Sequence, residues 1–160
     1  MTTDLDVTIR PATANDAAAI FAITRASVEG LAANHYTPQQ IDGWMGDRTP
    51  ETYANDARSG RIKVAEVSGR PIGYVDAVQG EITRLFLLPE FSGHGIGKRL
   101  MLVGLEMARA GHTGSLRIEA TRNTEAFYER FGFRRVGTGI FAGRNGDWPA
   151  IETVLMSREE

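Results

Sequence analysis

The sequence contains no cysteine and only three histidines among its 160 residues. The absence of cysteine excludes a thiol nucleophile, a disulfide framework and a cysteine-ligated metal. The histidines, His35, His94 and His112, are far apart, and none has a potential metal ligand three or four residues further on. We therefore expect no metal site.

The chain also lacks an excess of positive charge and a long apolar run. It has 18 lysine and arginine residues against 20 aspartate and glutamate residues, for a formal net charge of -2, so it has no basic stripe for binding nucleic acid. No stretch approaches the run of apolar residues that a membrane-spanning helix needs. The polar, acidic N-terminus lacks the basic and apolar regions of a signal peptide. We expect a cytoplasmic protein that binds neither nucleic acid nor membrane.

What is present is the composition of one ordinary globular domain, with 42% hydrophobic and 24% charged residues. We expect this domain to span residues 1–160, with its core at about 7–157. Hydrophobic periodicity, capping residues and turn residues predict its elements. The expected strands are 7–10, 61–67, 71–78, 81–88, 115–120, 133–141 and 151–157, and the expected helices are 17–31, 37–46, 49–58, 95–110 and 123–131. This order indicates an α/β fold of the α+β type, with a mixed, mostly antiparallel sheet of about seven strands and helices on both faces.

A glycine-rich loop, Ser92-Gly93-His94-Gly95-Ile96-Gly97, lies between the strand 81–88 and the helix 95–110. Glycines leave the backbone uncovered, and the first N–H groups of a helix have no partner inside it, so this loop could bind a phosphate or pyrophosphate. A Walker A loop does not fit, because Arg99 follows Gly97-Lys98 where Ser or Thr is needed. A dinucleotide fingerprint does not fit either, because the glycine spacing is G-x-G-x-G. The loop alone does not exclude the alternative that it is a glycine-rich turn that binds no ligand.

Two longer motifs, one of which contains this loop, resemble those of a known family. The segment 85–100, LFLLPEFSGHGIGKRL, resembles the acetyl-CoA signature of the GNAT superfamily of N-acetyltransferases. The segment 123–133, NTEAFYERFGF, resembles the family's second signature, N-x-x-x-F-Y-x-x-x-G-F, and Ile9-Arg10-Pro11-Ala12 followed by Asp16 is similar to its first strand and helix. The resemblance covers about residues 7–157. Both signatures, in this order, indicate a GNAT domain.

The resemblance implies acetyl-CoA as co-substrate and a central splay between the fourth and fifth strands, 81–88 and 115–120. Backbone groups at Phe86 and Leu87 would then be free to pair with pantetheine. The residues implied in cofactor binding are Leu85, Phe86, Leu87, Ser92, Gly93, His94, Gly95, Ile96, Gly97, Lys98, Asn123, Phe127 and Tyr128. Lys98, Arg99 and Arg122 could meet the 3′-phosphate. Ser92 stands where the family usually has Gln or Arg, so a long side chain that could reach the phosphates is missing.

Acetyl transfer to an amine requires a base, because an alkyl amine with a pKa near ~10.4 is mostly protonated at neutral pH, and often an acid for the departing thiolate. The resemblance places Tyr128 beside the sulfur as the acid. Glu81, at the start of a strand whose residues 81, 83, 85 and 87 should share a face, is our first candidate base. Glu119, on the next strand, is the second. The residues alone do not exclude that Tyr128 is an ordinary core tyrosine and that Glu81 and Glu119 are solvated carboxylates without a catalytic role.

The acceptor should bind near the helices that precede the first hairpin and near the loop 142–150. Ser27, Glu29, His35 and Tyr36, with Trp44 nearby, are the candidate acceptor-binding residues. We expect an N-acetyltransferase that moves an acetyl group from acetyl-CoA to a primary amine, of a small molecule or a peptide, by direct attack in a ternary complex. The alternative is a non-catalytic acyl-CoA-binding regulatory domain. A homodimer is an expectation by analogy with the family.

Overall fold

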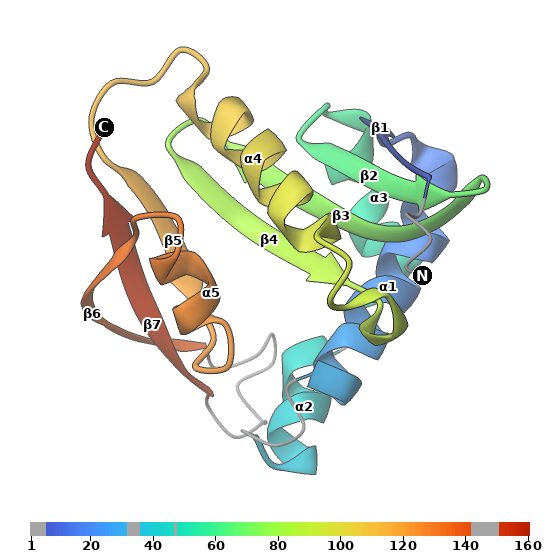
Figure 1. Ribbon diagram of the computed structural model, residues 1–160. Coiled ribbons are helices and arrows are strands. Elements are labelled where there is room, and N and C mark those ends of the chain that lie inside the picture. The colour runs from blue at the N-terminus through green and yellow to red at the C-terminus, as the bar shows by residue number, and fades with distance from the viewer. Residues whose placement is uncertain (1–5, 32–35, 47, 142–150) are drawn as a thin grey trace.

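The computed structural model describes residues 6–31, 36–46, 48–141 and 151–160. Within these ranges seven strands form one mixed sheet in the order β1-β2-β3-β4-β5-β7-β6 (Figure 1). The strands are β1 (Val7–Pro11), β2 (Ile62–Val67), β3 (Arg70–Val78), β4 (Glu81–Leu87), β5 (Leu116–Ala120), β6 (Arg134–Phe141) and β7 (Ile151–Arg158). The helices are α1 (Ala17–Leu31), α2 (Pro38–Met45), α3 (Pro50–Arg58), α4 (Ile96–Arg109) and α5 (Glu125–Glu129), with short 3-10 turns η1 (Ala14–Asp16) and η2 (Pro89–Phe91). The α+β fold predicted from the sequence is confirmed.

Local capping explains where the early helices begin. The Gln40 N–H donates to Thr37 Oγ1 at 3.1 Å, and the Thr37 N–H donates to Gln40 Oε1 at 3.0 Å, so α2 starts on a complete capping box followed by Pro38. From the sequence, Asn15-Asp16 is the expected N-cap of the first helix, and this prediction is wrong. Asp16 lies inside η1, and its carboxylate accepts the Thr13 N–H at 2.7 Å, so the turn begins after Thr13.

Helices cover both faces of the sheet, with α4 and α5 on one face and α1 and α3 on the other (Figure 1). Their helical spacing predicts that Ile96, Leu100, Val103 and Met107 of α4 form one buried stripe, and this is only half right. Ile96 and Leu100 are buried, but Val103 and Met107 are partly exposed, and the buried face continues through Met101. At Gly104 a Cβ atom would lie 2.8 Å from Val75 Cγ2, so the absence of a side chain lets α4 settle closely on β3. None of the described helices is long and apolar enough to cross a membrane.

The predicted splay is present. β4 and β5 pair in parallel only at Glu81–Arg117 and Ile82–Ile118, and beyond these two pairs the strands part (Figure 1). All the other strand pairs in the sheet are antiparallel. The splay therefore opens at the C-terminal end of β4, next to the glycine-rich loop.

A bulge in β4 changes which residues share a face. Asp76 lies opposite Arg84 and Ala77 opposite Ile82, so Thr83 is an extra residue in β4. Ile82 therefore faces α4, as its contact with the Gly104 site shows, and it shares that face with Leu85 and Leu87. The prediction that Glu81 shares a face with residues 85 and 87 is wrong, because the bulge shifts the alternation by one residue. Glu81 instead lies on the face of α1 and α3, with Arg84.

The Arg10–Asp16 contact makes stability depend on pH. Arg10 binds both carboxylate oxygens of Asp16 at 2.9 Å, and this guanidinium is the main reason that the Asp16 pKa is lowered. A lowered pKa means that the stabilisation is present above the unfolded-state value of about 3.9 and is lost as the pH falls through the folded-state pKa.

We predict that Asp16→Asn lowers the free energy of unfolding by about 2 kcal/mol at pH 7, because a hydrogen bond to a charged group is lost. In urea unfolding the difference from wild type should shrink below about pH 4. Glu90→Gln, which removes an ion pair whose two side chains are each 61% exposed, serves as the control. A deficit for Asp16→Asn that stays constant from pH 7 to pH 3 would contradict the role of the charge.

Candidate functional site

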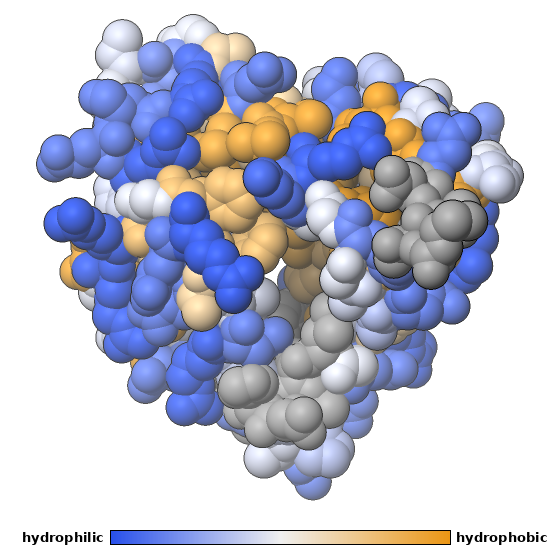
Figure 2. All heavy atoms as spheres, in the orientation of Figure 1, coloured by the Kyte–Doolittle hydropathy of each residue, from blue (hydrophilic) through white to orange (hydrophobic). Residues whose placement is uncertain are grey.

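The splay creates two cavities that meet between the strands. The large cavity, about 520 Å³, lies between β4, the glycine-rich loop and α5. The small cavity, about 210 Å³, lies between β4 and β5 on the other side. Figure 2 shows the molecular surface hollowed in the middle of one face, where hydrophobic residues gather. The residues that line both cavities are Leu85, Phe86, Thr121, Thr124 and Tyr128.

The glycine-rich loop forms an open cradle at the start of α4. Gly93 and Gly95 have φ angles of 84° and 75°, in the left-handed region that glycine adopts readily, and a Cβ atom on either would meet nothing within 4 Å. Gly95 is the N-cap of α4, so the N–H groups that follow it are the unpaired donors at the positive end of the helix dipole. The cradle therefore suits an anion.

The edge of β4 that faces the splay is set by the strand register. The Leu88 N–H donates to the Ile72 carbonyl at 2.9 Å, so alternation directs the backbone groups of Phe86 toward β3 and those of Leu85 and Leu87 into the splay. Backbone groups directed away from β3 were thus expected correctly at Leu87, misplaced at Phe86 and missed at Leu85. Ser27 Oγ donates to the Leu87 carbonyl at 2.7 Å.

Tyr128 lies where the two cavities join, and only 6% of it is exposed. Its ring packs edge-on against those of Phe127 and Phe133. Burial raises the pKa of its phenol well above the ordinary value. Among the described residues, no side chain forms a hydrogen bond with its hydroxyl, which therefore remains protonated and available as a donor.

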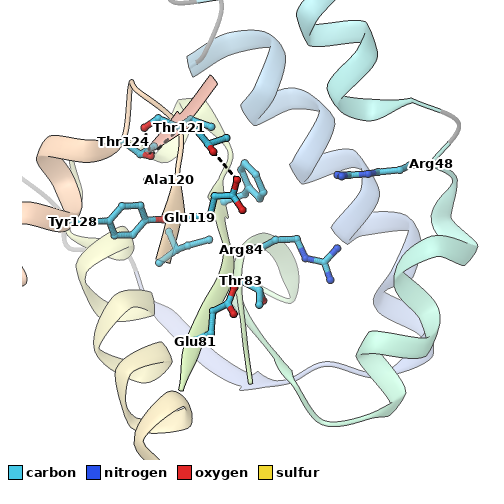
Figure 3. A pocket seen from close by; sticks show the side chains of 12 residues that line it. Arg48, Glu81, Thr83, Arg84, Glu119, Ala120, Thr121, Thr124 and Tyr128 are labelled. Carbon is cyan, nitrogen blue, oxygen red and sulfur yellow. Dashed lines mark hydrogen bonds between the residues drawn. The ribbon is translucent and has the colours of Figure 1, made fainter. Parts of the chain in front are cut away.

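Two carboxylates line the small cavity (Figure 3). Glu119 is the first β5 residue beyond the paired segment, and it accepts a hydrogen bond from Thr153 Oγ1 at 2.6 Å. Gly139 makes room for this contact, because a Cβ atom there would lie 2.8 Å from Thr153 Oγ1 and 3.1 Å from Glu119 Oε2. Glu81 lies in the paired segment and faces Arg117, 3.8 Å away. Of the two, Glu119 is at the fork of the strands.

Arg84, which lines the small cavity, belongs to a largely buried ionic cluster that we call the floor of this cavity. Asp76 is completely buried and accepts from Arg61 Nε at 2.6 Å and from Arg84 Nε at 2.8 Å. Arg84 also donates to Asp56 at 2.5 Å, and its guanidinium lies 5.1 Å from the centre of the Tyr53 ring. Two arginines and two aspartates balance in charge, so the floor is held rigidly by interactions among β3, β4 and α3.

Comparison with known proteins identifies the family. A family model described as Acetyltransferase (GNAT) domain matches residues 32–143, more than half of the chain. The chain belongs to the GNAT acetyltransferases. It is 27% identical over 131 residues to the Escherichia coli K12 protein named Uncharacterized N-acetyltransferase YafP, covering 82% of this chain and 83% of that protein. Membership in this family makes the chain an acyltransferase.

Solved GNAT structures have the same fold. The GCN5-related N-acetyltransferase described as Aminotransferase, Class-II, from Rhodopseudomonas palustris superimposes with a TM-score of 0.86 at 24% identity, covering 100% of this chain and 99% of that one. The PaiA N-acetyltransferase from Thermoplasma acidophilum, solved in complex with coenzyme A, superimposes with a TM-score of 0.75 at 19% identity, covering 98% and 100%. The resemblance seen in the two sequence signatures is confirmed at the level of the fold.

The GNAT site gathers most of the predicted cofactor residues. All of them except His94 line the large cavity, and Lys98 lies there together with Arg130, which the sequence reasoning missed. Arg99 and Arg122, suggested for the 3′-phosphate, are not among the residues that line it. The signal for Arg130 was its place two residues after Tyr128 in the second signature.

The predicted acceptor residues are not brought together. Ser27 lines the large cavity, and Glu29 lies on the surface, where its carboxylate pairs with Arg25 at 2.9 Å. Neither of these two side chains lines the small cavity. Tyr36 is buried and binds Arg122. His35, the Trp44 side chain and residues 142–150 lie outside the described part of the chain.

We predict that Asp76→Asn destabilises this GNAT domain by about 3 kcal/mol, because it leaves two partly buried guanidinium groups with one carboxylate. Urea unfolding at pH 7 measures the loss. The control is Glu29→Gln, whose ion pair with Arg25 is more than half exposed on both sides and should be worth less than about 1 kcal/mol. Equal effects of the two substitutions would show that the floor is not held by its charges.

Proposed function

We propose that this protein transfers an acetyl group from acetyl-CoA to a primary amine by direct attack in a ternary complex. The observation that carries the proposal is the junction of the two cavities at Tyr128. One cavity offers an anion cradle and an exposed strand edge, and the other offers carboxylates. A donor and an acceptor can therefore approach the same point from opposite sides of the sheet.

The large cavity offers contacts for the pyrophosphate and the pantetheine arm of coenzyme A. The cradle at Gly93–Gly97 suits the pyrophosphate, and the edge at Leu85 and Leu87 can pair with the amides of pantetheine as an added strand would. Lys98 and Arg130 supply positive charge for phosphate groups on the rim. These cations compensate for Ser92, which has no long side chain to contribute.

At the junction, Glu119 is our proposed base and Tyr128 our proposed acid. Glu119, directly or through water, takes a proton from the ammonium group, and the neutral nitrogen then attacks the thioester carbon. The new C–N bond forms, the C–S bond breaks, and the phenol proton of Tyr128 passes to the departing thiolate. The nitrogen gives up its remaining extra proton, which restores the phenol. The raised pKa of Tyr128 keeps the phenol proton in place until the thiolate develops. Glu81, one residue pair below the fork and facing Arg117, is the weaker candidate for the base.

The small cavity points to an amine presented on a small or narrow group. Its volume of about 210 Å³ is below the range of drug-sized ligand sites. Its lining includes the threonines Thr83, Thr121, Thr124 and Thr153, so it is polar as well as charged. A small polar amine, or the end of a peptide or side chain, fits such a space. A non-catalytic acyl-CoA-binding domain would need the large cavity but neither a protonated phenol nor a carboxylate at its end.

We predict that the wild-type protein releases coenzyme A thiol from acetyl-CoA in the presence of a suitable member of an amine panel. In that assay Tyr128→Phe should lower the rate about a hundredfold, because the thiolate loses its proton donor, and Glu119→Gln should do the same through the base. The dissociation constant of coenzyme A should change little in either variant. Glu81→Gln is the matched carboxylate control, with near wild-type rate.

The assay tests the transferase activity, the acid Tyr128 and the choice of base separately. Thiol release that no amine, peptide or drug-like acceptor raises above background would favour the binding domain. Full activity in Tyr128→Phe would remove the acid, and a larger loss in Glu81→Gln than in Glu119→Gln would exchange the two carboxylates.

We further predict that Gly95→Glu weakens coenzyme A binding about a hundredfold, equivalent to ~2.7 kcal/mol, because the new carboxylate occupies the cradle and repels phosphate. Isothermal titration calorimetry measures the change. Gly114→Glu is the matched control, since Gly114 also has a positive φ of 99° with open space around it but lies outside both cavities. If both variants bind coenzyme A equally well, the phosphates lie elsewhere.

A further inference from the structure

Tyr36 joins two parts of the chain that lie on opposite sides of the splay. It directly precedes the capped start of α2, and its side chain is only 5% exposed, in a small cluster with Val28, Ile41 and Met45. Phe86 of β4 packs against this same cluster. The Tyr36 ring is thus part of the packing that supports the end of β4.

The other side of the contact belongs to the connection between β5 and α5. The Arg122 backbone N–H donates to the Tyr36 hydroxyl at 2.9 Å, and the Arg122 guanidinium carbon lies 5.6 Å from the ring centre. This connection also carries Thr121 and Thr124, which line both cavities, and Asn123, which lines the large one. Tyr36 therefore acts on the rim of the junction without lining either cavity itself.

These contacts bound the gap between the splayed strands at both ends. At one end β4 and β5 are held together by the pairs Glu81–Arg117 and Ile82–Ile118. At the other end the Tyr36 cluster supports Phe86 on one rim, and the Tyr36 hydroxyl holds Arg122 on the other. The distance between the two strands is therefore held at one end by the strand pairing and at the other end by the contacts of Tyr36.

We infer that Tyr36 is a positioning residue that sets the width of this gap and thereby restricts the transferred acyl group to a short chain. The inference rests on the proposed function, because the thioester and its acyl group would lie in the gap beside Tyr128. A longer acyl chain needs the rims at Leu85 and Thr121 to move apart. The hydrogen bond from Arg122 to Tyr36 opposes that movement.

The test is Tyr36→Phe, which keeps the ring and its packing and removes only the hydroxyl. The variant and the wild type are assayed with acetyl-CoA, propionyl-CoA and butyryl-CoA against one amine, and kcat/KM is compared between donors. We expect acetyl-CoA use to fall roughly two- to tenfold, the value of one hydrogen bond, while the butyryl-to-acetyl ratio rises severalfold. The ratio does not depend on how much of the preparation is folded, so a loss of stability alone leaves it unchanged.

Tyr74→Phe is the matched control. Tyr74 is fully buried, and its hydroxyl donates to Thr24 Oγ1 at 2.7 Å, since that oxygen uses its own proton on the Ile20 carbonyl. It lines neither cavity, so its removal should leave the donor ratio at the wild-type value.

The results distinguish a failure of the role inferred for Tyr36 from a failure of the proposed acetyl transfer. An unchanged donor ratio in Tyr36→Phe overturns this inference while acetyl transfer by the wild type stands. Absence of transfer from every donor by the wild type overturns the proposed function and this inference with it. Amide hydrogen exchange of Arg122 in the wild type needs no variant: protection is expected, and exchange at the rate of an exposed amide overturns the inference.

Discussion

The parallel pairing between β4 and β5 lasts for two residue pairs and then stops. Beyond that point the edge of β4 has backbone donors and acceptors that no neighbouring strand satisfies, and buried groups of this kind need partners. Ser27 takes one of them, the Leu87 carbonyl. A ligand with amides along an extended arm can take the others. We therefore propose that the interruption of the sheet creates the coenzyme A site and connects the two faces of the sheet.

The charges of the site are arranged around this interruption. Asp76 is buried and its charge is compensated by Arg61 and Arg84, which links the elements at the floor of the small cavity. The carboxylate of Glu119 accepts a hydrogen bond from a neutral hydroxyl, that of Thr153. Tyr128 is desolvated and keeps its proton. The proposed base and the proposed acid therefore have different surroundings and meet at the fork, an arrangement suited to proton transfer in both directions.

Much of this could be predicted because the relevant signals are local. Threonine-proline pairs mark the starts of α2 and α3, periodicity marks the strands, and the cradle lies within six consecutive residues. The bulge at Thr83 could not be predicted, since it exists only in the register between β3 and β4. In the sequence, Gly139 is an ordinary glycine within a strand. Only the structure shows that Glu119 and Thr153 lie beside it.

The remaining features of the site were not predicted because they depend on contacts between residues far apart in the sequence. Arg84 and Asp56 are 28 residues apart, and Tyr36 and Arg122 are 86 apart, so neither pair has a sequence pattern. Ser27 and Glu29 are close in sequence, but the helix turns them in different directions, one toward β4 and the other to solvent. Candidate acceptor residues chosen by composition therefore lie in several places.

The most direct measurement is a crystal structure of the protein with coenzyme A bound. We predict that pantetheine lies along Leu85 and Leu87 in the splay, that the pyrophosphate contacts the backbone of Gly93–Gly97, and that the sulfur lies within hydrogen-bonding distance of the Tyr128 hydroxyl. Coenzyme A bound outside the splay, or a sulfur atom turned away from Tyr128, would contradict the claim that the interrupted pairing of β4 and β5 creates the site.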